Sequence, residues 1–144
     1  MGDGKPLYYD DVEVGDEMGP LLKKPTLEQV KAFCRAYGVE EPNRFTDLKA
    51  AREEGVPHLI IPGVMSMAYL SQLVTDWAPN IALKRLDVIF RGPVRHETDL
   101  HCKGLITDKE VRDGENCVEC DLYIEDAEGT RFVTGKATVA VPSR

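Results

Sequence analysis

The order of hydrophobic and polar positions divides the chain near its middle. From Val64 to Trp77 apolar side chains fall on nearly every side of the expected helix, and a helix that is apolar on all sides is a buried helix. Pro62 and Gly63 precede this stretch and Pro79 closes it, as expected for a helix with a marked start and stop. The pattern predicts one central helix of about 20 Å, which is too short to cross a bilayer.

After residue 80 the hydrophobic period changes to two. The ranges 82–91, 100–107, 117–125 and 131–141 alternate apolar with polar side chains, and residues 126–129 form a hairpin turn between the last two. Such alternation predicts four antiparallel strands, each with one apolar and one solvated face. The side chains expected to face inward are those of Ala82, Leu86, Val88, Phe90, Leu100, Cys102, Gly104, Ile106, Val118, Cys120, Leu122, Ile124, Val133, Ala137, Val139 and Val141.

The N-terminal third is predicted to carry two shorter helices. Thr26 and Gln29 have the spacing of a capping box, and Gly38 stands where the first of these helices would end. A second, short helix is predicted over 46–55, after a loop over 39–46. Before them, residues 8–24 are predicted to form a turn-rich segment with a short strand near its end, and residues 1–7 a flexible arm.

The composition is that of a single acidic domain. The 144 residues, 42% of them hydrophobic, suit one core, so we expect one domain over residues 1–144. Nucleic acids and anionic membranes require a basic face, and the net charge of −7 argues against both as partners. The first residues lack the apolar stretch of a signal peptide, and we therefore expect a cytoplasmic protein.

The four cysteines are interpreted as structural thiols. Cys117 and Cys120 share a predicted strand, where residues three apart point to opposite faces, so they are poorly placed to bridge or chelate. The three histidines, His58, His96 and His101, do not supply the ligand spacing of a metal site. We therefore expect neither a metal nor a cofactor.

A buried helix followed by an antiparallel meander is typical of the hot-dog fold, an α+β architecture. Four segments of this chain resemble the MaoC-like family of (R)-specific enoyl-CoA hydratases and dehydratases. They are YYDDVEVGDE (8–17), TLEQVKAFCRAYG (26–38), GVMSMAYLSQLVTDW (63–77) and LKRLDVIFRGPV (83–94). The resemblance spans nearly the whole chain, and it implies a single hot-dog domain that binds an acyl thioester, either of CoA or of an acyl carrier protein.

The resemblance also implies a mechanism. The family motif runs Asp-x-Asn-Pro-x-His-x-Asp, followed later by His-Gly, and its first Asp and first His activate a water molecule that adds across the enoyl double bond. The Gly amide, at the N-terminus of the central helix, hydrogen-bonds the thioester carbonyl, where negative charge develops. Pro42 matches the Pro of this motif and Gly63 matches its Gly, without a gap between them.

This sequence departs from the family motif at the positions that carry the chemistry. The catalytic Asp position is Val39 and the catalytic His position is Arg44. Neither side chain can accept a proton at a working pH. The Asn position is Glu41, the second Asp position is Thr46, and the His of the His-Gly pair is Pro62. The scaffold is therefore retained without the usual hydration groups.

Some polar residues near the motif are candidates for a rewired catalytic site. Glu41, Arg44 and Asp47 are the candidate catalytic residues, and solvated loop charges are the alternative interpretation. His58 is a further candidate to replace the missing histidine, with an ordinary loop histidine as the alternative.

The candidate substrate-binding residues fall into two groups. Gly63 and Val64, at the start of the central helix, are expected to meet the thioester. Arg91 and Arg95 are expected to contact the CoA phosphates, together with Lys84 and Arg85. Plain solvation of these basic side chains remains the alternative.

Three functions fit these observations. The first is the non-catalytic partner subunit of a heteromeric enoyl-CoA hydratase or dehydratase, because such enzymes can combine a chain bearing Asp and His with a chain lacking them. The second is a self-sufficient hydratase, dehydratase or thioesterase that uses Glu41 or Asp47, and the third is a non-catalytic binder of acyl-CoA or another apolar ligand. We favour the first and leave open whether the chain alone is an enzyme. Exposed sheet edges predict a homodimer, or a heteromer with another hot-dog chain.

Overall fold

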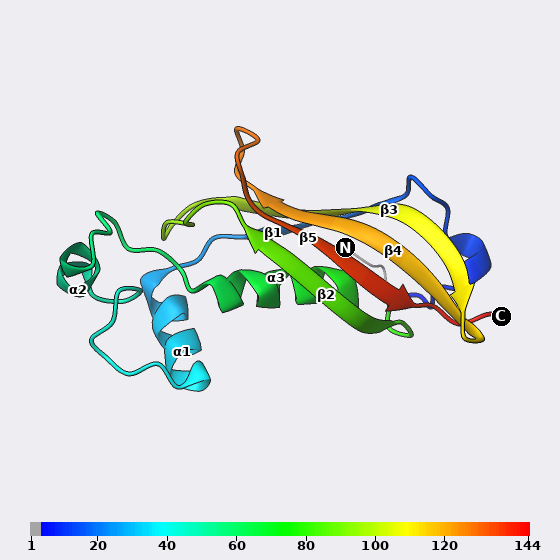
Figure 1. Cartoon of the computed structure of the whole chain (residues 1–144), viewed down its shortest axis with the longest axis horizontal. Helices are drawn as coiled ribbons and strands as arrows, with labels where there is room; N and C mark the ends of the chain where they lie inside the picture. The colour runs from blue at the N-terminus through cyan, green and yellow to red at the C-terminus, as the bar shows by residue number, and fades with distance from the viewer. Residues whose placement is uncertain (1–3) are drawn as a thin grey trace.

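A five-stranded antiparallel sheet curves over one long helix in the computed structural model, which describes residues 4–144 (Figure 1). The strands are β1 (Glu17–Lys23), β2 (Ala82–Phe90), β3 (Leu100–Arg112), β4 (Glu115–Glu125) and β5 (Arg131–Ala140). They lie in the order β1-β3-β4-β5-β2, so that β1 and β2 are the two edges. The predicted α+β class, the short N-terminal strand and the four later strands are confirmed.

The central helix α3 (Gly63–Thr75) fills the hollow of the sheet, as its all-round apolar sequence predicted (Figure 1). Leu70, Leu73 and Val74 have no exposed surface. They pack with the inward side chains of β3, β4 and β5, which include the predicted Leu100, Val118 and other members of the alternating pattern. Burial of this shared apolar face is the main force that holds helix and sheet together.

The predicted inward side chains are confirmed for β3, β4 and β5 but only in part for β2. Ala82 is exposed, and Leu83 packs against the core in its place. The reason is an irregular register between Leu83 and Arg85, where one extra residue reverses the order of inward and outward side chains. Phe90 is 52% exposed because it lies at the end of the strand, beside the start of α3.

The predicted third strand was too short. The range 100–107 extends in the structure to Arg112, because β3 and β4 form a long hairpin whose turn is made by Asp113 and Gly114. Both turn residues have positive φ, 52° and 78°, as a tight hairpin turn requires. Residues 108–112 have only one apolar side chain, that of Val111, and so gave no apolar alternation from which this extension could be predicted.

The helices α1 (Leu27–Tyr37) and α2 (Leu48–Glu53) lie beyond the end of the sheet where α3 begins (Figure 1). The capping box is confirmed, since the Thr26 hydroxyl accepts from the Gln29 amide at 3.2 Å and the Gln29 side chain accepts from the Thr26 amide at 3.1 Å. Gly38 ends α1 in the left-handed conformation, as predicted. The predicted short second helix is also present, and Asp47 is its N-cap.

A one-turn 3-10 helix, η1 (Tyr9–Asp11), precedes β1. The predicted flexible arm covers residues 1–7, of which 1–3 lie outside the described residues. Leu7 exchanges two hydrogen bonds of 2.8 Å with the Asn80 side chain, so the chain is already anchored there. None of the helices within residues 4–144 combines the length and the apolar character needed to cross a membrane.

Candidate functional site

A pocket of about 340 Å³ opens at the N-terminal end of α3, next to the last residue of β2. The loops before α2 and α3 form one side of it, and β2 with the turn that follows forms the other. Its lining is mostly apolar and includes two arginines. The lining residues are Arg44, Phe45, Val56, Ile60, Ile61, Gly63, Phe90, Arg91, Gly92, Pro93 and Val94.

Gly63 presents an unused backbone donor to this pocket. Pro62 is the N-cap of α3 and offers no side-chain hydrogen bond, and its carbonyl accepts from the Met65 amide at 3.0 Å. Across the described residues, no acceptor is bonded to the amides of Gly63 and Val64. The first amides of a helix have no partner within the helix, and they carry positive potential. This end of α3 can therefore donate to a ligand oxygen.

The absence of a side chain at Gly63 makes room for an aromatic ring. A Cβ atom added there would lie 2.9 Å from the Cζ atom of Phe90, closer than two carbon atoms can approach without displacement. The Phe90 ring therefore packs against the backbone at the start of α3 and borders the exposed amide.

Arg44 reaches the pocket from the loop between α1 and α2. Asn43 organises this loop, because its side chain accepts from the Phe45 amide at 2.9 Å and donates to the Glu40 carbonyl at 3.1 Å. The Arg44 guanidinium lies 5.1 Å from the centre of the Phe45 ring, a cation–π contact. Its ion pair with Glu54 is long, at 4.0 Å, and about half of each side chain is exposed.

Arg91 borders the pocket from the opposite side, at the end of β2, but its guanidinium turns to the outer face of the sheet, where it lines a second pocket with Thr134 and Asp121. Its backbone amide donates to the Phe132 carbonyl at 2.7 Å, which fixes the residue directly after β2. Its Nε atom donates to the Thr134 hydroxyl at 3.2 Å. Within residues 4–144, no carboxylate forms an ion pair with Arg91. The structure thus brings together three of the predicted residues: Arg44, Gly63 and Arg91.

The other predicted residues do not line this pocket. Glu41 is exposed and lies 3.9 Å from Arg35 on α1. Asp47 uses its carboxylate to accept the Ala50 amide at 3.1 Å, as the cap of α2. Val64 is half-buried on α3. Arg95 is exposed and does not line the pocket, although it forms an isolated β-bridge with Ile60, which does.

The pocket has no side chain that can exchange a proton. Val39, which the sequence resemblance matched to a catalytic Asp, packs against the core, and its amide donates to the Cys34 carbonyl at 2.8 Å at the end of α1. His58 is exposed and does not line the pocket. The lining contains no Asp, Glu, His, Cys or Tyr, and an arginine stays protonated. This arrangement can bind and polarise a ligand, but it holds no general base.

The groups with large pKa shifts lie in the core. Burial raises the pKa of Tyr69, on α3, to about 12. Burial likewise raises the pKa of the Cys102 and Cys120 thiols, on β3 and β4, to about 12. All four cysteines are buried and unbonded, in line with their interpretation as structural thiols.

Sequence reasoning missed the apolar walls of the pocket. Phe45, Val56 and Ile60 stand in loops where no period marks a buried position, and Phe90 was assigned to the core. The one available signal was the pair Phe90-Arg91 at the end of a predicted strand, where an apolar residue is followed directly by a charged one. The remaining members meet only because two loops and a strand end converge.

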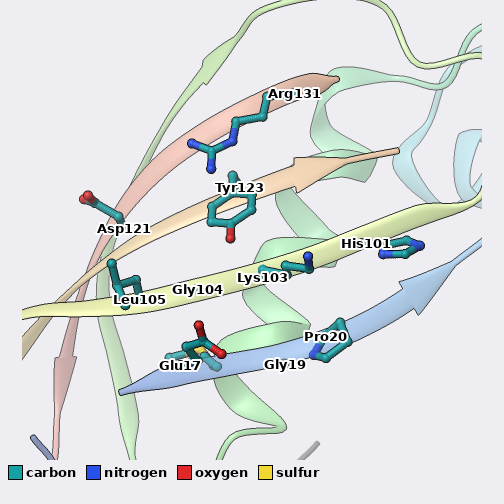
Figure 2. Close-up of a pocket in the computed structure, with 11 residues that line it drawn as sticks. Glu17, Gly19, Pro20, His101, Lys103, Gly104, Leu105, Asp121, Tyr123 and Arg131 are labelled. Carbon is teal, nitrogen blue, oxygen red and sulfur yellow. The ribbon is translucent and has the colours of Figure 1, made fainter. Parts of the chain in front are cut away.

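A larger pocket, of about 510 Å³, lies on the opposite face of the sheet. Figure 2 shows its side chains projecting from β1, β3, β4 and β5 on the face turned away from α3. Its cations are already engaged, since Lys103 lies 2.9 Å from Glu125 and Arg131 lies 4.0 Å from the centre of the Tyr123 ring. None of the predicted site residues lines it. The pocket at the start of α3 is therefore the better candidate site.

No protein-family model and no curated protein sequence matches this chain. Several solved structures share its fold at low identity. The (R)-hydratase PhaJ1 from Pseudomonas aeruginosa, unliganded, has a TM-score of 0.83 at 20% identity, over 96% of this chain and 88% of that chain. The MaoC-like dehydratase from Rhodospirillum rubrum has a TM-score of 0.81 at 22% identity, over 96% and 98%.

A third similar structure is an assembly of two different chains. The C-terminally truncated HadBC complex of Mycobacterium tuberculosis, a 3R-hydroxyacyl-ACP dehydratase, has a TM-score of 0.74 at 20% identity, over 88% of this chain and 96% of that chain. Together these structures confirm the predicted hot-dog fold.

Proposed function

Given the hot-dog fold that this chain shares with MaoC-like dehydratases and (R)-hydratases, we propose that it is a thioester-binding partner subunit. It binds an acyl thioester at the start of α3 and serves as the non-catalytic chain of a heteromeric enoyl hydratase or dehydratase. One observation carries this proposal. The pocket combines the free Gly63 amide with a mostly apolar lining that contains no side chain able to act as general acid or general base.

The free amide suits the carbonyl oxygen of a thioester. A helix N-terminus offers donors and positive potential to an oxygen that gains negative charge. The apolar side chains of Phe45, Ile60 and Val94 suit the carbon chain beside it. Binding without proton transfer is what this pocket can support, because Val39 and Arg44 stand where the family has its Asp and His.

The self-sufficient enzyme has less support. It requires Glu41 or Asp47 to activate a water molecule, and neither residue lines the pocket. Asp47 is engaged in capping α2, and Glu41 faces Arg35 near the end of α1. The partner-subunit role is further supported by the HadBC structure, which combines two chains in one dehydratase.

The free edge of β2 is the surface that we assign to the partner chain. β2 pairs only with β5, and its outer edge carries the exposed Ile89. The opposite edge, β1, contains Pro20 and an irregular register, both of which discourage pairing with another strand. Because β2 ends at Phe90, a partner on this edge would lie beside the pocket.

The test is calorimetric binding of crotonyl-CoA to the purified chain, with free CoA as reference. We expect crotonyl-CoA to bind more tightly than CoA. Gly63→Ala should weaken its binding about tenfold, because the new methyl group displaces the Phe90 ring toward the bound acyl group. Adding Phe90→Ala to this variant should restore part of the affinity.

Thr75→Ala, in the last turn of α3, is the matched control and should bind as wild type does. Equal affinity of the wild-type chain for crotonyl-CoA and free CoA would contradict thioester binding. A Gly63→Ala variant that keeps wild-type affinity would place the ligand elsewhere.

A further inference from the structure

A pocket of about 260 Å³ on the outer face of the sheet adjoins the candidate site. Arg91 borders both pockets, because its backbone follows β2 beside the start of α3 while its guanidinium bonds to Thr134 on the outer face. We call this second cavity the outer-face pocket; its lining comes from β2, β4 and β5 and from Arg91. It shares three residues, Asp121, Tyr123 and Arg131, with the larger pocket of Figure 2.

The strand register gives the outer-face pocket an apolar and aromatic middle. Ile89 of β2, Thr134 of β5 and Tyr123 of β4 lie opposite one another. The Arg131 guanidinium lies 4.0 Å from the centre of the Tyr123 ring, and Figure 2 shows both side chains on the face of the sheet turned away from α3. Two planar groups in contact form a surface on which a further flat ring can stack.

One end of the outer-face pocket is cationic. Arg91 and Arg131 lie there, and in the described part of the chain no carboxylate forms an ion pair with Arg91. The neutral Thr134 hydroxyl engages the Nε atom of Arg91. Arg131 lies 3.7 Å from Glu125, but Lys103 holds that carboxylate more closely, at 2.9 Å. The terminal nitrogens of Arg91 are therefore available to a phosphate, which an arginine binds through paired hydrogen bonds.

The other end of the outer-face pocket carries two carboxylates. The register places Lys136 between Asp87 and Asp121. Asp87 is also paired with Arg85 at 2.7 Å, and Asp121 lies 3.8 Å from Lys136. The charges at this end balance, so it offers carboxylate oxygens as hydrogen-bond acceptors but no spare cation for an anion.

An adenine nucleotide carries the three kinds of group that this pocket can bind. Its phosphates suit the cationic end, and its flat base suits the surface formed by Tyr123 and Arg131. The amino group of the base is a donor that suits the carboxylates at the other end. CoA contains such a nucleotide, joined to the thioester by the pantetheine arm.

The outer-face pocket also lies within reach of the candidate site. On the proposed function, on which this inference rests, the thioester carbonyl lies at the Gly63 amide, in a pocket that Arg91 also borders. Neighbouring strands lie about 5 Å apart, so Tyr123 on β4 is about 10 Å across the sheet from β2. The pantetheine arm is a long extended chain that can cover this distance around the end of β2, where Gly92 has no side chain to block it.

We propose that the carrier of the bound acyl group is CoA, and that the adenine nucleotide of CoA occupies the outer-face pocket. Arg91 and Arg131 bind its phosphates, the Tyr123 ring supports its base, and the Asp121 carboxylate accepts from its amino group. An acyl carrier protein presents the same pantetheine arm with one phosphate, but it has no base for this pocket. Binding is non-covalent and changes no bond.

The experiment compares three thioesters of one acyl group by calorimetry: crotonyl-CoA, crotonyl-phosphopantetheine and crotonyl-pantetheine. The second keeps the phosphate of the arm but lacks the adenine nucleotide, and the third lacks every phosphate. We expect crotonyl-CoA to bind the purified chain about 10- to 100-fold more tightly than crotonyl-phosphopantetheine.

Three variants separate the parts of the outer-face pocket. Arg91→Gln should weaken crotonyl-CoA about tenfold through the lost phosphate contact and leave crotonyl-pantetheine unchanged. Tyr123→Leu should weaken crotonyl-CoA about tenfold through lost stacking and leave both shorter thioesters unchanged. Arg35→Gln is the control for net charge, because Arg35 is an exposed arginine on α1 that lines neither pocket; it should bind all three thioesters as wild type does.

Equal affinities for crotonyl-CoA and crotonyl-phosphopantetheine would overturn this inference in favour of an acyl carrier protein and leave the proposed function standing. An Arg91→Gln variant that weakens crotonyl-pantetheine as much as crotonyl-CoA would place Arg91 at the acyl group and would also overturn it. If crotonyl-pantetheine bound no more tightly than pantetheine itself, the proposed function would fail, and this inference with it.

Discussion

Single residues decide which chemistry this pocket can perform. Arg44 and Val39, which the resemblance matches to the family's His and Asp, carry a permanent positive charge and no titratable group, respectively. Gly63 contributes through the absence of a side chain. The Phe90 ring packs against the backbone there, and the Gly63 amide remains without a hydrogen-bond acceptor among the described residues. On the proposed function, this pocket binds a thioester without a side chain that moves protons.

The buried thiols make stability depend on pH in the alkaline range. Burial raises the pKa of Cys102 and Cys120 from about 9 in the unfolded chain to about 12 in the folded protein. Below pH 9 each thiol is protonated in both states and adds no pH dependence. Above pH 9 the unfolded thiols lose protons that the folded protein retains, so the free energy of unfolding falls as pH rises toward 12.

We predict that Cys120→Ala reduces the alkaline loss of stability. Each such thiol lowers the free energy of unfolding by about 1.4 kcal/mol per pH unit between the two pKa values. Urea unfolding between pH 8 and 11 should give a shallower decline for the variant. Val118→Ala, at an equally buried position on β4, is the control for lost packing and should keep the wild-type slope. If the free energy of unfolding of Cys120→Ala fell with pH as steeply as that of the wild type, the attribution of this pH dependence to the buried thiols would be contradicted.

At the scale of elements, local patterns predicted most of the structure. The capping box and Gly38 define α1 from a few neighbouring residues, and alternation defines the inward faces of β3, β4 and β5. The register irregularity in β2 and the extension of β3 to Arg112 depend on pairing with other strands. No local pattern in the sequence carries that information, so the prediction missed them.

The two sheet edges are predicted to behave differently. The chain alone should sediment at twice its 16.1 kDa mass at micromolar concentration, through pairing of β2 edges. Ile89→Lys should yield the 16.1 kDa monomer, because a lysine on an edge strand opposes pairing with another strand.

Leu22→Lys makes the matching change on β1, at a side chain that is 65% exposed, and it should remain a dimer. A monomeric wild-type chain, or dissociation caused by Leu22→Lys alone, would contradict association through β2.

At the scale of the whole molecule, the candidate site lies where the two halves of the chain meet. Arg44 and Gly63 come from the N-terminal loops and the start of α3, and Arg91 comes from the end of β2. Motif alignment identified the first two, and the basic residues after the strand identified the third. The apolar lining could not be predicted, because Phe45, Val56 and Ile60 become neighbours only when the loops converge.

The central claim is that this chain binds a thioester without catalysing its hydration. The most direct test follows the loss of enoyl absorbance when a short trans-2-enoyl-CoA is incubated with the purified chain. We predict no turnover above the uncatalysed rate, because general acid–base groups worth about 10²–10⁴ in rate are missing. Turnover should appear when a hot-dog chain bearing the Asp and His is added. Robust turnover by this chain alone, collapsing in Glu41→Gln or Asp47→Asn, would contradict the account.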